Sequence, residues 1–156
     1  MEWPVRCRAG LVWMAVALVA LGLAVVLFAQ LAQILTRLVG PLGLAGTDEV
    51  SRFAFVWAAF MGMAAGLDLG AHHAFGLLRE RLSGAAAWTV AVVVETLTML
   101  ALLLLGWHGW GMALRAHQQL SPSLGLSMSW MYAAMPAAAI LMALLLVLRW
   151  LERERA

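Results

Sequence analysis

Apolar residues form four long runs along the chain, and the short segments between them carry most of its turn and polar residues. The first run, 11–35, has no charged residue and exceeds the roughly 20 residues that a helix needs to cross the hydrocarbon core. It is also longer than the roughly 7 to 15 apolar residues of a signal peptide, so we expect a retained helix. The pattern predicts an all-α membrane protein, one integral membrane domain over 1–156, with transmembrane helices at about 11–35, 49–70, 85–111 and 128–149.

The second run is short for a crossing, because Arg52 and Asp68 enclose only 15 charge-free residues. A helix over 49–70 would be long enough if its end charges reach toward the two membrane surfaces. The segments between the runs contain turn and breaker residues, as in "VGPLGLAGTDE" and "HQQLSPSLGLS". They are too short for a soluble domain.

Arginine is divided unequally between the two sides of the predicted bundle. Cytoplasmic segments of membrane proteins carry an excess of basic residues, so we predict that both termini and the segment between the second and third helices are cytoplasmic. The arginines of that side are Arg6, Arg8, Arg79, Arg81, Arg149, Arg153 and Arg155, against Arg37, Arg52 and Arg115 on the other.

Tryptophan supports these boundaries, because its indole ring favours the headgroup region of a bilayer. Trp57 lies deeper in its predicted helix than the others. The tryptophans close to predicted helix ends are Trp13, Trp88, Trp107, Trp110, Trp130 and Trp150.

Composition agrees with a membrane protein, since 65% of the 156 residues are hydrophobic and only 12% are charged. The net charge of +2 is spread in small groups between the apolar runs, which fits membrane topology and gives no reason to expect nucleic-acid binding. The single cysteine, Cys7, excludes a disulfide framework within the chain. No nucleophile array, phosphate loop or metal-ligand spacing is present in the sequence, so we expect neither an enzyme nor a cofactor.

The stretch "TDEVSRFAFVWAAFMG", residues 47–62, places Glu49 and Arg52 directly against an apolar run. Gly62, Gly66 and Gly70 follow at four-residue intervals, a spacing that lets a second helix backbone approach closely. Two interpretations are open. Glu49 and Arg52 could form a local pair beside ordinary packing within this chain, or the small-residue stripe could be a docking surface for a second membrane protein.

Glu95 is an acid inside a long apolar run, and an ionised acid at the centre of a transmembrane helix costs about 2.5 to 3.5 kcal/mol. It could be protonated, bond to Thr98 or another helix of the chain, or meet a cation in a partner. A proton-coupled exporter would also use an intramembrane glutamate, but small four-helix exporters carry theirs in the first helix, which has none here.

Polar or helix-breaking residues in or next to the second and fourth predicted helices have specific structural consequences. His72 and His73 are adjacent, so on a helix they point about 100° apart and cannot both face one metal. Asp68 could pair with a histidine four residues on or with Arg79 or Arg81. Pro136 should kink the fourth helix and free a carbonyl.

With these features the chain resembles the small permease (DctQ-like) subunit of tripartite ATP-independent periplasmic (TRAP) transporters. The resemblance is strongest in "DEVSRFAFVWAAFMGMAAGLDLGAHHAF" and extends to "LSPSLGLSMSWMYAAMPAAAILMALLLVLRWL". Asp68, Leu69 and His73 depart from the family pattern, so the end of the second helix could bind differently. The residues that match are Glu49, Arg52, Trp57, Phe60, Gly62 and His72 in the first segment and Ser121, Pro122, Trp130, Tyr132 and Pro136 in the second.

The resemblance implies a non-catalytic subunit in a bacterial inner membrane. It would form a heterodimer with the large permease subunit, which moves substrate with sodium, while a periplasmic solute-binding protein delivers an organic acid such as a dicarboxylate or sialic acid. Membrane lipids would surround it. Glu49 and Arg52 would lie at the periplasmic end of the second helix, fixing its depth and the register of the scaffold or the docked binding protein.

Two other functions stay open. The chain could be a self-contained small oligomeric transporter that uses Glu95, or a membrane anchor subunit of another complex.

Overall fold

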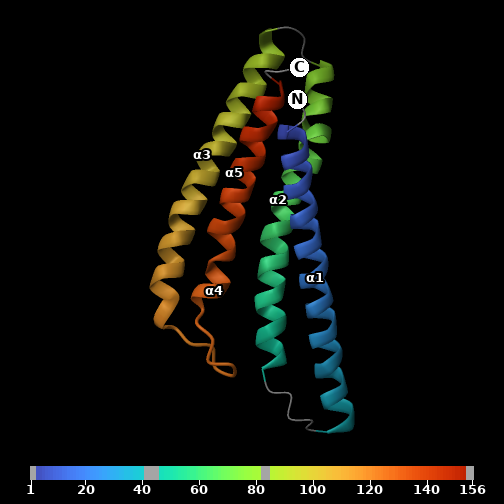
Figure 1. The fold of residues 1–156 in the computed structure, drawn as a ribbon, viewed down its shortest axis with the longest axis vertical. Coiled ribbons are helices and arrows are strands. Elements are labelled where there is room, and N and C mark those ends of the chain that lie inside the picture. Colours follow the sequence, from blue (N-terminus) through green and yellow to red (C-terminus); the bar gives the residue numbers. More distant parts are fainter. Residues whose placement is uncertain (1–2, 41–45, 82–84, 154–156) are drawn as a thin grey trace.

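Helices make up almost all of the computed structural model, which describes residues 3–40, 46–81 and 85–153, and their side chains except those of 69–81, 85, 87 and 153. Four of its helical segments are long and apolar enough to cross a membrane, which confirms the predicted all-α membrane fold. Both described ends of the chain lie at the same end of the bundle (Figure 1). The elements are α1 (Trp3–Val39), α2 (Thr47–Arg81), α3 (Ala85–Arg115), the 3-10 helix η1 (Ala116–Gln118), α4 (Ser129–Tyr132) and α5 (Ala134–Arg153).

The last membrane-crossing segment is divided, because α4 ends at Tyr132 and α5 begins at Ala134. Pro136 therefore lies in the first turn of α5. The backbone N–H groups of a first turn have no acceptor within their own helix, so a residue without an N–H costs little there. The backbone at Ala133 is still helical, with φ −63° and ψ −20°. The interruption coincides with the carbonyl of Tyr132, to which Pro136 has no N–H to donate, and the predicted kink stays a prediction.

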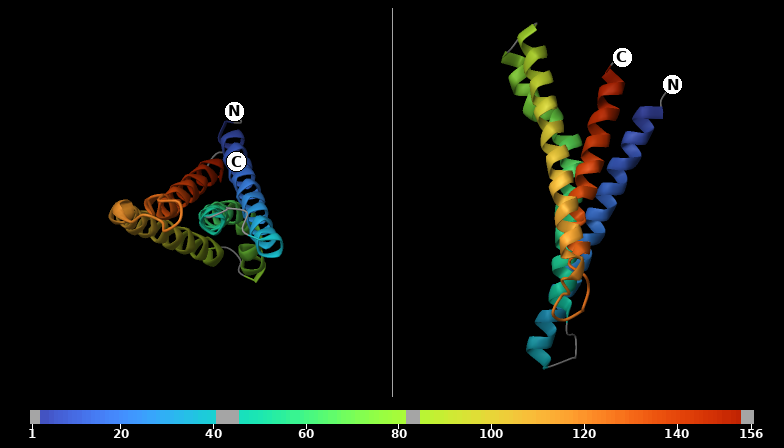
Figure 2. Two further views of the ribbon diagram at one scale, coloured as in Figure 1. Left: turned by 90° about the horizontal axis from the view of Figure 1, so that it is seen from below. Right: turned by 90° about the vertical axis from the view of Figure 1, so that its left-hand side faces the viewer.

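Helix α2 lies at the centre of the bundle, with α1, α3 and α5 around it when the molecule is viewed along its long axis (Figure 2). It packs antiparallel to α1, and α5 packs against α1, α2 and α3. The buried cluster between them consists mainly of small and unbranched residues, which lets the helices approach closely. Its members are Ala15, Met61, Ala64, Ala65, Leu102, Ala138, Leu141, Met142 and Leu145.

Helices α1 and α2 approach each other closely at Gly22. A Cβ atom at this position would lie 2.9 Å from the Cβ of Ala58 and 3.1 Å from the carbonyl oxygen of Ala54. Real Cβ atoms do not come this close to their neighbours, so the two helices can pack at this distance only because residue 22 has no side chain.

A second close contact joins α3 to α5, where a Cβ at Gly109 would lie 2.9 Å from Cδ of Pro136 and 3.0 Å from Sδ of Met135. One turn earlier, a Cβ at Gly106 would meet the Cβ of Ala139 at an ordinary 3.6 Å. These contacts fix the register of the antiparallel pair, because residues 106 and 109 of α3 lie level with 139 and 136 of α5.

Candidate functional site

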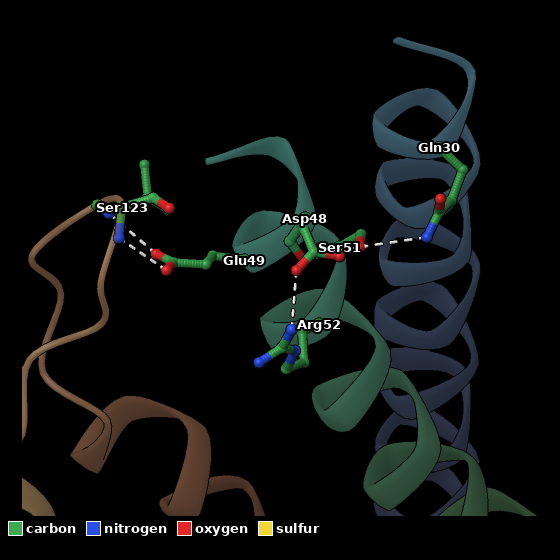
Figure 3. A network of polar contacts seen from close by, with 7 residues as sticks. Gln30, Asp48, Glu49, Ser51, Arg52 and Ser123 are labelled. Carbon is green, nitrogen blue, oxygen red and sulfur yellow. Dashed lines mark hydrogen bonds and ion pairs between the residues drawn. The ribbon is translucent and has the colours of Figure 1, made fainter. Parts of the chain in front are cut away.

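The carboxylate of Glu49 holds a loop from the other half of the chain. Its two oxygens accept hydrogen bonds from the backbone N–H groups of Ser123 at 2.8 Å and Leu124 at 2.9 Å. Glu49 belongs to the first turn of α2 and is only 6% exposed. Figure 3 shows its side chain pointing away from α1 and toward the loop. Hydrogen bonds to an ionised carboxylate are among the stronger ones in proteins, so this contact ties the start of α2 to the segment that joins α3 to α4.

That segment, residues 119–128, is a hairpin loop and not an irregular connection. The N–H of Ser121 donates to the carbonyl of Leu126 at 2.8 Å, and the N–H of Met128 donates to the carbonyl of Gln119 at 2.8 Å. Gly125 has φ +65°, a conformation that glycine adopts without steric cost. The hairpin loop is therefore shaped by its own backbone and presents the N–H groups of its tip to Glu49.

The next residues of α2 face other partners. Ser51, which is buried, donates to the carbonyl of Asp48 at 2.9 Å and lies 3.4 Å from Nε2 of Gln30 on α1. Arg52 pairs with Asp48 at 2.8 Å, and both side chains are more than half exposed. The local pair that the sequence suggested for Arg52 thus exists, but its acid is Asp48 and not Glu49 (Figure 3).

A second link between α2 and the last helices lies about two turns deeper. The indole N–H of Trp57 donates to the backbone carbonyl of Trp130 on α4 at 3.0 Å. The ring of Trp130 itself is exposed, whereas Tyr132 at the end of α4 is half-buried. The structure therefore joins two residues that the sequence singled out, Trp57 and Trp130, whereas Glu49 contacts the loop before α4.

The small-residue stripe of α2 is divided between two environments. Gly62 faces α1, where an added Cβ would lie 3.6 Å from Val19, and Phe60 is half-buried against the core. Gly66 is exposed, and a Cβ at this position would have no atom of another helix within 4 Å. Gly70 and His72 belong to the part of α2 whose side-chain surroundings the structure does not describe, so their predicted roles are untested.

An ion-pair cluster occupies the opposite end of the bundle. Arg8 Nη1 of α1 lies 3.2 Å from Asp68 Oδ1 of α2, and Arg8 Nε lies 3.1 Å from Glu152 Oε1 of α5. All three side chains are less than one quarter exposed. Asp68 thus pairs with Arg8, a partner that the sequence did not suggest, and one guanidinium joins three helices.

The axial register of α3 against α5 places Glu95 nearer to one end of the bundle than to its middle. Eleven residues separate Glu95 from Gly106, and eleven separate Ala139 from Trp150, so in this antiparallel pair Glu95 lies level with Trp150. This level is close to Glu152 and its partner Arg8. The sequence suggested an acid deep in the membrane because the apolar run continues on both sides of Glu95, but α3 is longer than one crossing requires.

Neither the contacts of Glu49 nor the cluster at Arg8 could be read from the sequence. Ser123 and Leu124 contribute through backbone N–H groups, which every residue but proline has, and Glu152 is 144 residues from Arg8. The sequence signal was limited to the turn composition of "LSPSLGLS". Among the residues that the structure describes, no group of three or more His, Cys, Asp or Glu side chains is placed to hold a metal ion.

The comparison with protein families agrees with the resemblance found in the sequence. A comparison with curated proteins found no match. The family model of the DctQ component of tripartite ATP-independent periplasmic transporters matches residues 26–156, which include α2, α3, the hairpin loop and α5 as well as Glu49 and its partners. The family consists of transporter components and is not a family of enzymes. Together with the four membrane-crossing segments, this match makes the chain a multi-pass membrane member of the DctQ family, the small permease component of TRAP transporters.

Proposed function

We propose that the chain is the fixed scaffold beside the large permease subunit in binding-protein-dependent, sodium-coupled uptake of an organic acid, such as a dicarboxylate or sialic acid, across a bacterial inner membrane. The observation that carries this proposal is the family match over residues 26–156. A component of a tripartite system works with two other proteins, and the proposed ones are the large permease subunit and a periplasmic solute-binding protein.

The internal ties of the bundle support a scaffold role. Glu49 holds the hairpin loop at one end, Arg8 joins three helices at the other, and Trp57 links α2 to α4 between them. A subunit against which a second protein moves must keep its own helices fixed, and these contacts oppose sliding of α2 against its neighbours. With the arginine-rich end in the cytoplasm, Glu49 and Arg52 would lie at the periplasmic end.

The exposed part of the small-residue stripe is the proposed contact for the large subunit. Gly66 leaves a gap on the surface of α2, and small residues on a membrane helix allow another helix to pack closely. Arg52 is also more than half exposed beside Asp48, so it is accessible to a partner at the membrane surface.

The test is co-purification of the tagged chain with the large membrane protein encoded beside it, followed by mass determination and by transport assays in proteoliposomes. We expect a one-to-one heterodimer, and uptake that requires both subunits and the binding protein. A chain that transports alone as an oligomer would instead establish the self-contained transporter, and a stable partner that transports nothing would establish the membrane anchor.

A matched pair of variants tests the contact surface. Gly66→Leu should leave the isolated chain folded, because the position is open, but should reduce the yield of heterodimer. Gly10→Leu, at an equally open position on α1, is the control and should leave the heterodimer intact. Equal yields for both variants would remove Gly66 from the contact.

A further inference from the structure

We propose that the hairpin loop, residues 119–128, lies in the interfacial layer of the bilayer, against phospholipid headgroups and the upper parts of the acyl chains, and not in water. This inference concerns the lipid contact of the chain and does not depend on which complex it joins. It rests on the backbone of the hairpin loop, on its exposed side chains and on its depth along the bundle.

Most backbone N–H groups of the hairpin loop donate hydrogen bonds within the protein, whereas a loop in water could donate them to the solvent. Besides the two N–H groups bound by Glu49, the N–H of Gly125 donates to the carbonyl of Ser121 at 3.0 Å, and that of Leu126 donates to Oγ of Ser121 at 3.2 Å. Pro122 has no N–H to pair. Outside water, an unpaired backbone N–H costs several kcal/mol, so internal pairing is the condition for placing a loop at membrane depth.

The exposed side chains of this region carry no charge: several are apolar, and Gln119 and Ser123 are the exposed polar ones in the hairpin loop. Leu120 is 66% exposed, Leu126 is 47% exposed and the nearby Trp130 is 66% exposed. No Asp, Glu, Lys or Arg occurs between Arg115 and Arg149. Exposed leucines beside an exposed indole, with no charge among them, suit the zone where headgroups meet acyl chains.

The depth of the hairpin loop follows from its contact with Glu49. Nineteen residues of α2 separate Glu49 from Asp68, which is about 28 Å at the helical rise of about 1.5 Å per residue. This nearly equals the hydrocarbon thickness of about 30 Å, with the Arg8 cluster at its other limit. On α1, Gln30 lies level with Ser51, and Leu31, Ile34 and Leu35 beyond it are still apolar and exposed. Lipid therefore extends past the level of Glu49.

Lipid fits this layer better than a single protein partner. Apolar side chains are exposed near this level on α1 (Leu31 and Ile34) and, somewhat deeper, at the end of α3 (Leu114) and on α4 (Trp130). Helices α1 and α3 lie on different sides of the bundle (Figure 2). A belt that continues around the molecule matches a membrane interface, whereas a docked protein would cover one side.

The experiment measures the environment of a nitroxide spin label on the full chain in vesicles of phosphatidylethanolamine and phosphatidylglycerol. Cys7, the only cysteine of the sequence, is first replaced by serine. In this Cys7→Ser chain, Leu126→Cys and Leu120→Cys are made as separate variants, and each carries one spin label. Arg37→Cys, seven residues beyond Gln30 on α1, is the water-facing control. Leu103→Cys, exposed on α3, is the lipid-facing control.

We expect the labels at 126 and 120 to collide with a water-soluble nickel chelate several-fold less often than the label at 37, and with oxygen nearly as often as the label at 103. Nickel collisions equal to those at 37 would overturn the proposal. Loss of oxygen contact when the large permease subunit binds would also overturn it, by showing that a protein covers this face. The two hairpin positions are independent, so one misfolded variant leaves the other to decide.

Discussion

The carboxylate of Glu49 accepts a hydrogen bond of 2.8 Å from the backbone N–H of Ser123, although 74 positions separate the two residues. The contact closes one end of the bundle, because it joins the first turn of α2 to the tip of the hairpin loop between α3 and α4. An acid at the edge of an apolar run is thus explained by a partner within the same chain. Its neighbour Arg52 remains accessible at the surface.

Replacing Glu49 by alanine should free the hairpin loop. The N–H groups of Ser123 and Leu124 lose their acceptors, so their amides should exchange hydrogen several-fold faster, and the thermal midpoint of the chain should fall. Hydrogen-exchange mass spectrometry of peptides that cover 119–128 measures the first effect. Asp48→Ala is the control, since it removes only an exposed pair with Arg52 and should leave the exchange rates unchanged. Unchanged exchange in Glu49→Ala would show that the loop does not depend on this carboxylate.

Gly22→Ala should separate α1 from α2. Its Cβ would come within 2.9 Å of Ala58, and overpacking of this kind costs about 1 to 3 kcal/mol. Gly62→Ala lies on the same interface but meets Val19 at 3.6 Å, so it should be neutral or gain up to about 1 kcal/mol from helix propensity. Unfolding of the purified chain in mixed micelles measures both changes. Equal stability of the two variants would contradict the close approach at Gly22.

Trp57→Phe keeps an aromatic ring but removes the donor to the carbonyl of Trp130. The net loss of one hydrogen bond is about 0.5 to 1.5 kcal/mol, and we expect a decrease of this size in the unfolding free energy. Trp107→Phe, at a position with an exposed ring, is the matched control and should change stability little in detergent. A decrease of the same size in both variants would assign the effect to the loss of any indole and not to this bond.

Arg8→Ala should destabilise the chain more than either Asp68→Asn or Glu152→Gln. Arg8 contacts both acids, so its removal leaves two carboxylates close together without a cation, whereas each acid variant removes one contact and one charge. Hydrogen bonds to charged groups contribute about 1.5 to 3 kcal/mol, which sets the expected size for Arg8→Ala. The measurement is the thermal unfolding midpoint of these three variants. Arg6→Ala, which replaces an exposed neighbouring arginine, is the control. A loss no greater in Arg8→Ala than in Arg6→Ala would refute the cluster.

The sequence predicted the membrane fold because the length of an apolar run is a local property. A run such as 11–35 must cross the bilayer wherever its neighbours lie, and four such runs leave few alternatives to a helical bundle. The resemblance to the DctQ family was equally accessible, since it depends on residues close together in the chain, such as Glu49, Arg52 and Trp57.

Pairings between distant residues were not accessible. The sequence placed Glu49 beside Arg52, but on α2 the carboxylate turns toward the hairpin loop and Arg52 turns toward Asp48. Likewise, the position of Glu95 near one end of the bundle follows from the register of α3 on α5, which no local pattern reveals.

What the sequence by itself determined is therefore the number of crossings, the apolar character of their surfaces and the family. Only the tertiary structure decided the partners of Glu49 and Arg8 and the division of the glycine stripe between Gly62 and Gly66. The physical reason is that hydrophobic patterning acts along a single helix, whereas hydrogen bonds, ion pairs and close helix contacts depend on the rotation and axial register of two helices at once.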